Sequence, residues 1–446
     1  MESSSASTNS NWTTLVLVVL GVSSVVLYRF GLRAEDASDI TWFLQLVAGQ
    51  AILYLVAAWV ILRSQPNRAA FVTVIVFAAL FRLSILFAPP FLSDDIYRYV
   101  WDGRVQAAGA NPYRYIPADP ALVQLRDEAV YPKINRREYA HTIYPPLAQT
   151  IFFLTTRISE SITWMKVTML GFEAIGIWAI IQLLTVFGLS RQRVLLYAWH
   201  PLIVWELAGS GHVDAVTVAF LMMALWARQR NFEAVVGIAL ACATLVKLFP
   251  LVLFPALYKG WGWKMPLAFA ATILIAYLPY LNVGPMAVLG FLPGYVTEEG
   301  LANGEAFYLL SLARKLISIP NAAFLIFSVV VMIGLAAWSV FKVEQGALCY
   351  VKRAVVLATV AMVLFAPHYS WYFAWLVPFL CFVPVASLLY LTCASFVLYA
   401  TWLGDDADQM FLMNSAIYVP FVLLVVIEQF LRRRQFPAAP DKVTVD

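Results

Sequence analysis

Two adjacent carboxylates stand in the polar stretch FLSDDIYRYVWDG of an otherwise apolar sequence. Ser93 or Asp94 can cap a helix that begins near Asp95, because a side-chain oxygen there satisfies a free backbone N–H. On that helix Asp95, Arg98 and Asp102 share one face by their spacing. Such carboxylates can supply a general base, and the arginine can hold their geometry or an anionic substrate. The alternative is an acidic first turn that only complements the helix dipole.

Three later motifs add polar side chains that suit a binding site. His141 and Tyr144 lie in HTIYPPLAQ. His212 and Asp214 follow two glycines in GSGHVDAV. Lys247 lies in TLVKLFP, where the proline is expected to end the helix and to aim the ammonium group into a cavity, in which it can bind a phosphate. The structural alternatives are an interfacial aromatic belt, a capped turn and a lysine that snorkels to the membrane surface.

A further motif, APHYSWYFAWLVP, is rich in aromatic side chains. These rings can stack against a sugar or a prenyl chain, although aromatic belts at membrane interfaces have the same composition. The His-x-Asp pair at His212 lacks a third ligand at metal-binding spacing, so we expect no metal. The aromatic candidates are His368, Tyr369, Trp371 and Tyr372.

The elements that position these residues are expected to be membrane-spanning helices. Of the 446 residues, 62% are hydrophobic and only 13% are charged, whereas a soluble globular protein has about 25% charged residues. The apolar residues cluster in runs of about 20, the length of a helix that crosses the hydrocarbon core, and the alternation of barrel strands is absent. We therefore expect an all-α polytopic transmembrane bundle of about 12–14 spans. The net charge of +4 is modest and scattered, which argues against a nucleic-acid partner.

The distribution of lysine and arginine predicts which helix ends face the cytoplasm. Basic residues such as Arg191 and Arg228 are expected inside, which places both termini inside and the loop at 90–143 outside. The apolar segment at 144–156 is too short to cross a membrane and contains two prolines near its start, so we expect an interfacial or re-entrant helix there and an outer loop that carries interfacial helices. Three of the four histidines then fall on one outer face. This coincidence favours a single extracytoplasmic site.

The order of these motifs resembles that of the GT-C superfamily of membrane glycosyltransferases. The similarity is greatest to polyprenol-phosphate-mannose-dependent mannosyltransferases, which include the catalytic subunit of GPI mannosyltransferase I and bacterial lipoglycan enzymes. The resemblance extends over residues 70–260 and, more loosely, over 360–380. The resemblance rests on four motifs that occur in the same order: the acidic loop, the Tyr-Pro-Pro-Leu re-entry, the Gly-x-His-x-Asp turn and the Val-Lys-Leu-Phe-Pro motif.

The resemblance also implies a division of the chain. The first two helices are extra relative to a family plan in which the first helix leads directly into the acidic loop. The expected regions are a cytoplasmic tail with two accessory transmembrane helices (1–69), a catalytic membrane module with its outer loop at 90–160 (70–281), and a C-terminal membrane region with outer loops at 282–320 and 366–370 (282–446).

The resemblance implies roles for individual residues by position. Asp94 falls where the family's loop aspartate serves as general base, with Asp95 as its helper, and this adjacent pair replaces the usual spaced one. Lys247 matches the lysine expected near the donor phosphate, where Arg98 or Arg104 would add positive charge. The side chains expected to contact substrate are Asp102, His141, Tyr144, His212, Asp214, His368, Tyr369, Trp371 and Tyr372.

The function implied by the resemblance is inverting transfer of a sugar, mannose by preference, from a polyprenyl-phosphate donor. The acceptor is a glycan, a glycolipid or a lipid, and neither a cofactor nor a metal is expected. We expect a multi-pass protein in contact with membrane lipids, in a bacterial plasma membrane or alternatively the endoplasmic reticulum, with its site on the extracytoplasmic side. The alternatives are a transporter or flippase of lipids or lipid-linked sugars, and a non-catalytic assembly subunit.

Overall fold

The computed structural model describes residues 2–260, 262–404 and 407–435 of the chain. Helices make up 74% of the structure, and the described residues contain no strand. In a helix the backbone N–H and C=O groups pair within the same segment. An apolar chain in lipid requires this pairing, because no water is present to satisfy those groups. The expected class, a polytopic helical bundle, is confirmed.

The α-helices differ widely in length, and the shortest are single turns within broken segments. They are α1 (Glu2–Gly31), α2 (Ile40–Arg63), α3 (Arg68–Ile85), α4 (Asp95–Ala107), α5 (Pro146–Thr156), α6 (Ile162–Val186), α7 (Leu195–Ala198), α8 (Pro201–Ile203), α9 (Asp214–Gln229), α10 (Glu233–Thr244), α11 (Phe254–Leu257), α12 (Lys264–Tyr277), α13 (Leu292–Glu298), α14 (Tyr308–Arg314), α15 (Asn321–Phe341), α16 (Cys349–Phe365), α17 (Ala386–Ala394) and α18 (Ala407–Gln435).

Short segments of other helix types connect or extend these helices. One is a π-helix, η5 (Val204–Gly209), and the rest are 3-10 helices. The 3-10 helices are η1 (Ala37–Asp39), η2 (Pro120–Leu125), η3 (Tyr131–Lys133), η4 (Arg191–Val194), η6 (Phe249–Leu253), η7 (Leu278–Val283), η8 (Ala287–Leu289), η9 (Ser370–Cys381) and η10 (Ser395–Leu403).

Eight helical segments among the described residues are long and apolar enough to cross a membrane. The other apolar stretches form shorter helices, such as the 16-residue α9 and the 12-residue α10. The described residues thus contain fewer full-length spans than the expected total of about 12–14, and the remaining expected spans fall on shorter or broken helices. The eight are Asn11–Gly31, Ala37–Arg63, Arg68–Ile85, Ile162–Val186, Lys264–Val283, Asn321–Phe341, Ala386–Leu403 and Asp408–Arg432.

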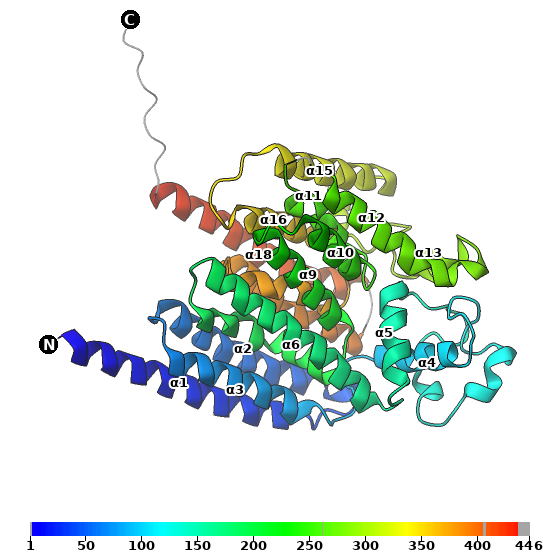
Figure 1. The fold of residues 1–446 in the computed structure, drawn as a ribbon, viewed down its shortest axis with the longest axis horizontal. Helices are drawn as coiled ribbons and strands as arrows, with labels where there is room; N and C mark the ends of the chain where they lie inside the picture. Colours follow the sequence, from blue (N-terminus) through cyan, green and yellow to red (C-terminus); the bar gives the residue numbers. More distant parts are fainter. Residues whose placement is uncertain (1, 261, 405–406, 436–446) are drawn as a thin grey trace, which may run out of the picture.

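The long helix α1 packs against α2 and α3, an ion pair joins α3 to α6, and the outer loop extends from one end of this bundle (Figure 1). The short helices α4, α5 and α13 gather at that end. The first turns of α1 and the last turns of α18 lie at the opposite end (Figure 1). The loop at 90–143 and the described ends of α1 and α18 thus lie at opposite ends of the bundle, and which end faces the cytoplasm stays a prediction.

A buried ion pair links α3 to α6 within the helix bundle. Arg82 of α3 and Glu173 of α6 form a two-point salt bridge, and the Arg82 guanidinium also donates to the carbonyl oxygen of Ala198. Both charged side chains are less than 10% exposed. Such a pair is costly to break because one charge would stay buried alone. It therefore holds α3, α6 and the short helix α7 in a fixed arrangement.

Candidate active site

The two members of the acidic pair have different surroundings at the start of α4. Asp95 is the first residue of α4, and its Oδ1 accepts a hydrogen bond of 2.9 Å from Asn135 Nδ2. Its Oδ2 lies 4.0 Å from His212 Nδ1, and Tyr144 interacts with the same carboxylate. Asp94 is the N-cap residue, but its exposed side chain makes no capping hydrogen bond. Partial removal from water and the adjacent carboxylate of Asp95 raise the pKa of Asp94.

Arg98 and Asp102 form a buried pair along α4. The Arg98 Nε lies 2.8 Å from Asp102 Oδ1, and the other oxygen of Asp102 accepts hydrogen bonds from Thr142 Oγ1 and Gln149 Nε2. Gly103 lies so close to α5 that a Cβ there would meet a backbone carbonyl oxygen of α5 at 2.5 Å. These contacts hold α4 against α5. Arg98 and Asp102 are thus members of a satisfied polar network inside the outer loop.

Arg104 and His141 belong to the same framework of the outer loop. Arg104 forms ion pairs with Asp127 at 2.7 Å and with Glu160 at 2.9 Å. His141 is half-buried, and burial together with the positive charge of Arg98 lowers its pKa. The charge of Arg104 is therefore already neutralised by two carboxylates, and His141 is neutral at pH 7.

The turn before α9 places His212 in the interior of the protein. Gly211 adopts a φ of +75°, which favours glycine and reverses the chain directly before the histidine. The imidazole of His212 is 1% exposed and stacks on Trp371 with ring centroids 4.6 Å apart. Its Nε2 lies 3.4 Å from Oε2 of Glu206, whose other oxygen accepts a hydrogen bond of 2.6 Å from Tyr399. Burial lowers the pKa of His212 to about 4, so the ring is neutral at pH 7.

Lys247 forms an ion pair with Asp214, the first residue of α9. The Lys247 Nζ lies 2.7 Å from Asp214 Oδ2, and the side chains are 12% and 0% exposed. The same Nζ lies 4.9 Å from the ring centroid of Tyr372. Two backbone N–H groups in the first turn of α5 donate to the carbonyl oxygen of Leu245, at 3.2 and 3.3 Å. The end of the outer loop is therefore fixed to the chain two residues before Lys247.

Aromatic residues of the motif at 366–378 pack around these polar groups. Tyr369 stacks on Trp371 with ring centroids 4.5 Å apart, which continues the stack formed with the imidazole of His212. The Tyr372 hydroxyl shares a hydrogen bond of 2.6 Å with the Tyr295 hydroxyl. The structure thus brings the predicted aromatic residues beside His212 and Lys247, although these segments lie far apart in the sequence.

The residue directly after α13, Glu299, contributes a carboxylate to this aromatic group. The Glu299 Oε1 accepts a hydrogen bond of 3.2 Å from the Tyr369 hydroxyl, and its Oε2 lies 3.7 Å from His368 Nδ1. Arg136 lies 3.3 Å from the same carboxylate. Burial raises the pKa of Glu299, with Arg136 opposing the shift, and burial lowers the pKa of His368.

Several residues that complete the site were not among the residues predicted from the sequence. Glu206 had a usable signal, because a carboxylate within the apolar segment VWELAG is unusual at membrane depth. The tyrosines had none, since single aromatic residues are common throughout the chain. The added residues are Asn135, Glu206, Tyr295, Glu299 and Tyr399.

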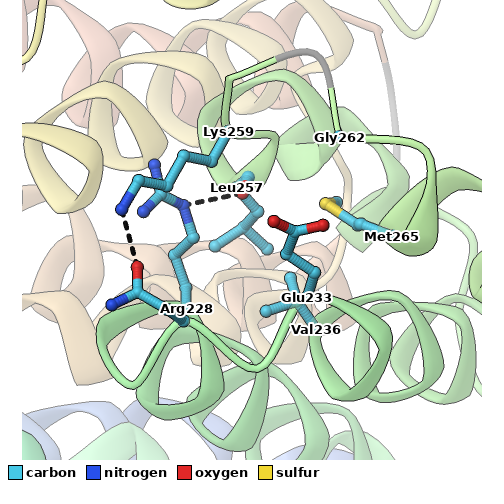
Figure 2. A pocket seen from close by; sticks show the side chains of 8 residues that line it. Arg228, Glu233, Val236, Leu257, Lys259, Gly262 and Met265 are labelled. Atoms are coloured by element: carbon cyan, nitrogen blue, oxygen red, sulfur yellow. Dashed lines mark hydrogen bonds between the residues drawn. The ribbon is translucent and has the colours of Figure 1, made fainter.

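A small cavity at the other end of α9 is separate from this cluster. Figure 2 shows its lining, in which Arg228 Nε donates to the carbonyl oxygen of Leu257 and Lys259 Nζ donates to Asn231. Its volume of about 10 Å³ suits one water molecule rather than a sugar. The 16-residue α9 separates it from Asp214 by roughly 24 Å of helix. The candidate active site is therefore the cluster around His212.

Comparison with known families assigns the chain to a family of membrane enzymes. The family model of the alpha-(1→6)-mannopyranosyltransferase N-terminal domain matches residues 13–264. The chain belongs to this family. No curated protein matches the chain.

The match confirms the resemblance to GT-C mannosyltransferases. It covers α1 to the start of α12 and so includes the acidic loop, the His212 turn and Lys247. Together with the eight apolar helices, it makes the protein an integral-membrane glycosyltransferase of the mannosyltransferase type.

Proposed function

We propose that the protein transfers mannose from a polyprenyl-phosphate donor to a glycan, glycolipid or lipid acceptor at the extracytoplasmic face, with inversion at the sugar carbon. The observation that carries this proposal is the convergence of a carboxylate and a cation on one imidazole. His212 Nδ1 lies 4.0 Å from Asp95 Oδ2 of the acidic loop, and Lys247, three residues after α10, is ion-paired with Asp214, two residues after His212. A base and a phosphate-binding cation on one cluster are the two groups that this reaction requires.

The reaction would proceed as a single displacement. The oxygen of an acceptor hydroxyl attacks C1 of the mannose as the bond from C1 to the phosphate oxygen breaks. A carboxylate takes the hydroxyl proton. The polyprenyl phosphate leaves with the bonding electrons, and Lys247 stabilises its growing negative charge. Asp214 lies against the same ammonium, so the leaving phosphate has to share this cation with a buried carboxylate.

Asp95 is the better candidate for the base in this arrangement. The sequence-based choice of Asp94 stays a prediction, but the contacts of Asp95 with Asn135, His212 and Tyr144 favour the second carboxylate. Those contacts fix its direction toward the cluster, whereas the exposed Asp94 has no such restraint. Asp94 would then shape the helix start and the local charge.

An apolar groove supports a donor with an isoprenoid chain. The groove has a volume of about 490 Å³, and all of its lining residues are apolar except Ser328. Its lining begins at Leu251, four positions after Lys247, and along α15 it extends from Leu325 to Ala336, roughly 16 Å of helix. This volume lies within the range of about 300–1,000 Å³ that is usual for ligand pockets. A chain lying there would have its phosphate end on the side of Lys247.

The test is transfer of radiolabelled mannose from polyprenyl-phosphate mannose by the purified protein, with a lipid extract of the source membrane as acceptor. We expect a labelled product that requires both protein and acceptor extract. Asp95→Asn keeps the shape of the side chain but cannot accept the proton, so the transfer rate should fall about 10²–10⁴-fold. Asp94→Asn should lower it much less. If both variants are folded and monodisperse and keep the parental activity, neither carboxylate of the acidic loop is the catalytic base.

A further inference from the structure

Glu206 is a buried carboxyl group with no role in the displacement described above. It lies in the π-helix η5, is 0% exposed, and one of its oxygens accepts the hydrogen bond from Tyr399. Its Oε2 has no hydrogen-bond partner among the described residues and lies 3.4 Å from His212 Nε2. π-Helical turns occur frequently at functional sites because they redirect side chains out of the regular helical register. The position of Glu206 therefore calls for a functional explanation.

The imidazole of His212 is held between two carboxyl groups. Nε2 faces Glu206, Nδ1 faces Asp95, and neither nitrogen has a hydrogen-bond partner among the described residues. The backbone N–H of His212 donates to the carbonyl oxygen of Glu206 at 3.0 Å, and Trp371 stacks on the ring. A Cβ on Gly211 would lie 2.5 Å from Ile96 Cδ1, so this turn packs directly against α4. The ring thus has a fixed place beside the base.

The protonation states follow from burial and from the charges around these groups. A neutral imidazole carries one N–H donor and one acceptor nitrogen. Within the described part of the chain, no lysine or arginine lies at ion-pair distance from Glu206, and the cation that acts on it, Lys247, is paired with Asp214. An ionised carboxylate without a paired cation is expensive to bury, so the neutral carboxyl is favoured. A protonated Oε2 would donate to Nε2 and leave the ring proton on Nδ1.

We propose that Glu206, in its protonated form, fixes the tautomer of His212 whose Nδ1–H points at Asp95, and that this N–H orients the carboxylate for proton acceptance. Both are positioning residues that act through Asp95, so the proposal rests on the function proposed above. The 4.0 Å separation is too long for a hydrogen bond, so the proposal requires that it shorten by about 1 Å in the substrate complex, where catalytic hydrogen bonds tighten. Since His212 is 1% exposed, it reaches substrate only through the carboxylate.

Two substitutions of Glu206 separate the donor role from a packing role. Glu206→Gln keeps an N–H that can donate to His212 Nε2 and an oxygen that can accept from Tyr399, so its kcat should stay within about threefold of the parent. Glu206→Leu has similar volume and no donor, so its kcat should fall at least about tenfold with the donor KM within twofold. This split follows because an interaction made only through the base affects the chemical step.

The measurement is steady-state transfer from polyprenyl-phosphate mannose by the full chain in detergent, in the parental and Asp95→Asn backgrounds. In the second background Glu206→Leu should cause no further loss, because groups that act as one unit are not additive. A structural defect would lower the residual rate again and overturn the proposal. So would parental kcat in Glu206→Leu, or equal losses in the Leu and Gln variants.

The same data separate this proposal from the function on which it rests. Absence of mannose transfer by the parental protein would remove the proposed function itself. Full activity of Asp95→Asn would refute the assignment of Asp95 as the base, and with it the positioning role of Glu206 and His212. Full activity of Glu206→Leu beside an inactive Asp95→Asn would overturn the positioning role alone.

Discussion

Replacing Lys247 by methionine tests the donor site most directly, but the structure shows that stability has to be measured with activity. The substitution removes the ammonium group that lies 2.7 Å from Asp214, a side chain with 0% exposure. Loss of one partner of a buried pair costs about 3–5 kcal/mol of stability, because the other charge stays buried alone. A loss of transfer by Lys247→Met could therefore reflect unfolding rather than a missing phosphate contact.

A second substitution separates the two effects. In the double variant Lys247→Met/Asp214→Asn neither charge remains, so most of the lost stability should return. The phosphate-binding cation is still missing, and a charge-assisted hydrogen bond is worth about 1.5–3 kcal/mol. At about 1.4 kcal/mol per factor of ten, kcat/KM for the donor should stay roughly ten- to hundredfold below the parental value.

The assay combines thermal unfolding in detergent with transfer rates over a range of polyprenyl-phosphate mannose concentrations. Lys259→Met is the matched control, because this exposed lysine contacts Asn231 at the other end of α9 (Figure 2) and should change neither quantity. A double variant with parental kcat/KM for the donor would refute the reasoning. Lys247 would then be only the counter-ion of Asp214.

Two further predictions concern pH and topology. The pKa of His212 is about 4 in the folded protein, and its ordinary value is 6.5. The unfolded chain therefore binds a proton first as the pH falls, and the free energy of unfolding should decrease by about 2 kcal/mol between pH 7.5 and pH 5. His212→Asn should show a smaller decrease in melting temperature over that range, and equal decreases would contradict the assigned burial. In a chain without its four cysteines, an impermeant thiol reagent should label Val123→Cys but not Lys259→Cys in intact cells. Labelling of both would break the proposed orientation.

The fold class followed from the sequence because apolar runs and a low charge content leave a chain few choices in lipid. The acidic helix start was also predictable, since a cap residue and the spacing of Asp95, Arg98 and Asp102 are local properties. The short segment at 144–156 was expected to be too short to cross, and it forms the 11-residue α5. The lengths of the other helices were less predictable, because Pro201 and the π-helix η5 break the apolar stretch between α6 and α9 into short turns.

The partners within the site were decided only by the tertiary structure. Spacing along one helix could place Arg98 near Asp102, but it could not show that Lys247 finds Asp214 or that Glu206 faces His212. Those pairs join segments that are separated in the sequence and come together only when the helices pack. Burial then determines their charge states, because a buried charge persists only where another element supplies a partner. The sequence by itself thus identified many of the polar and aromatic residues that gather at the candidate site, whereas packing decided which of them pair with one another.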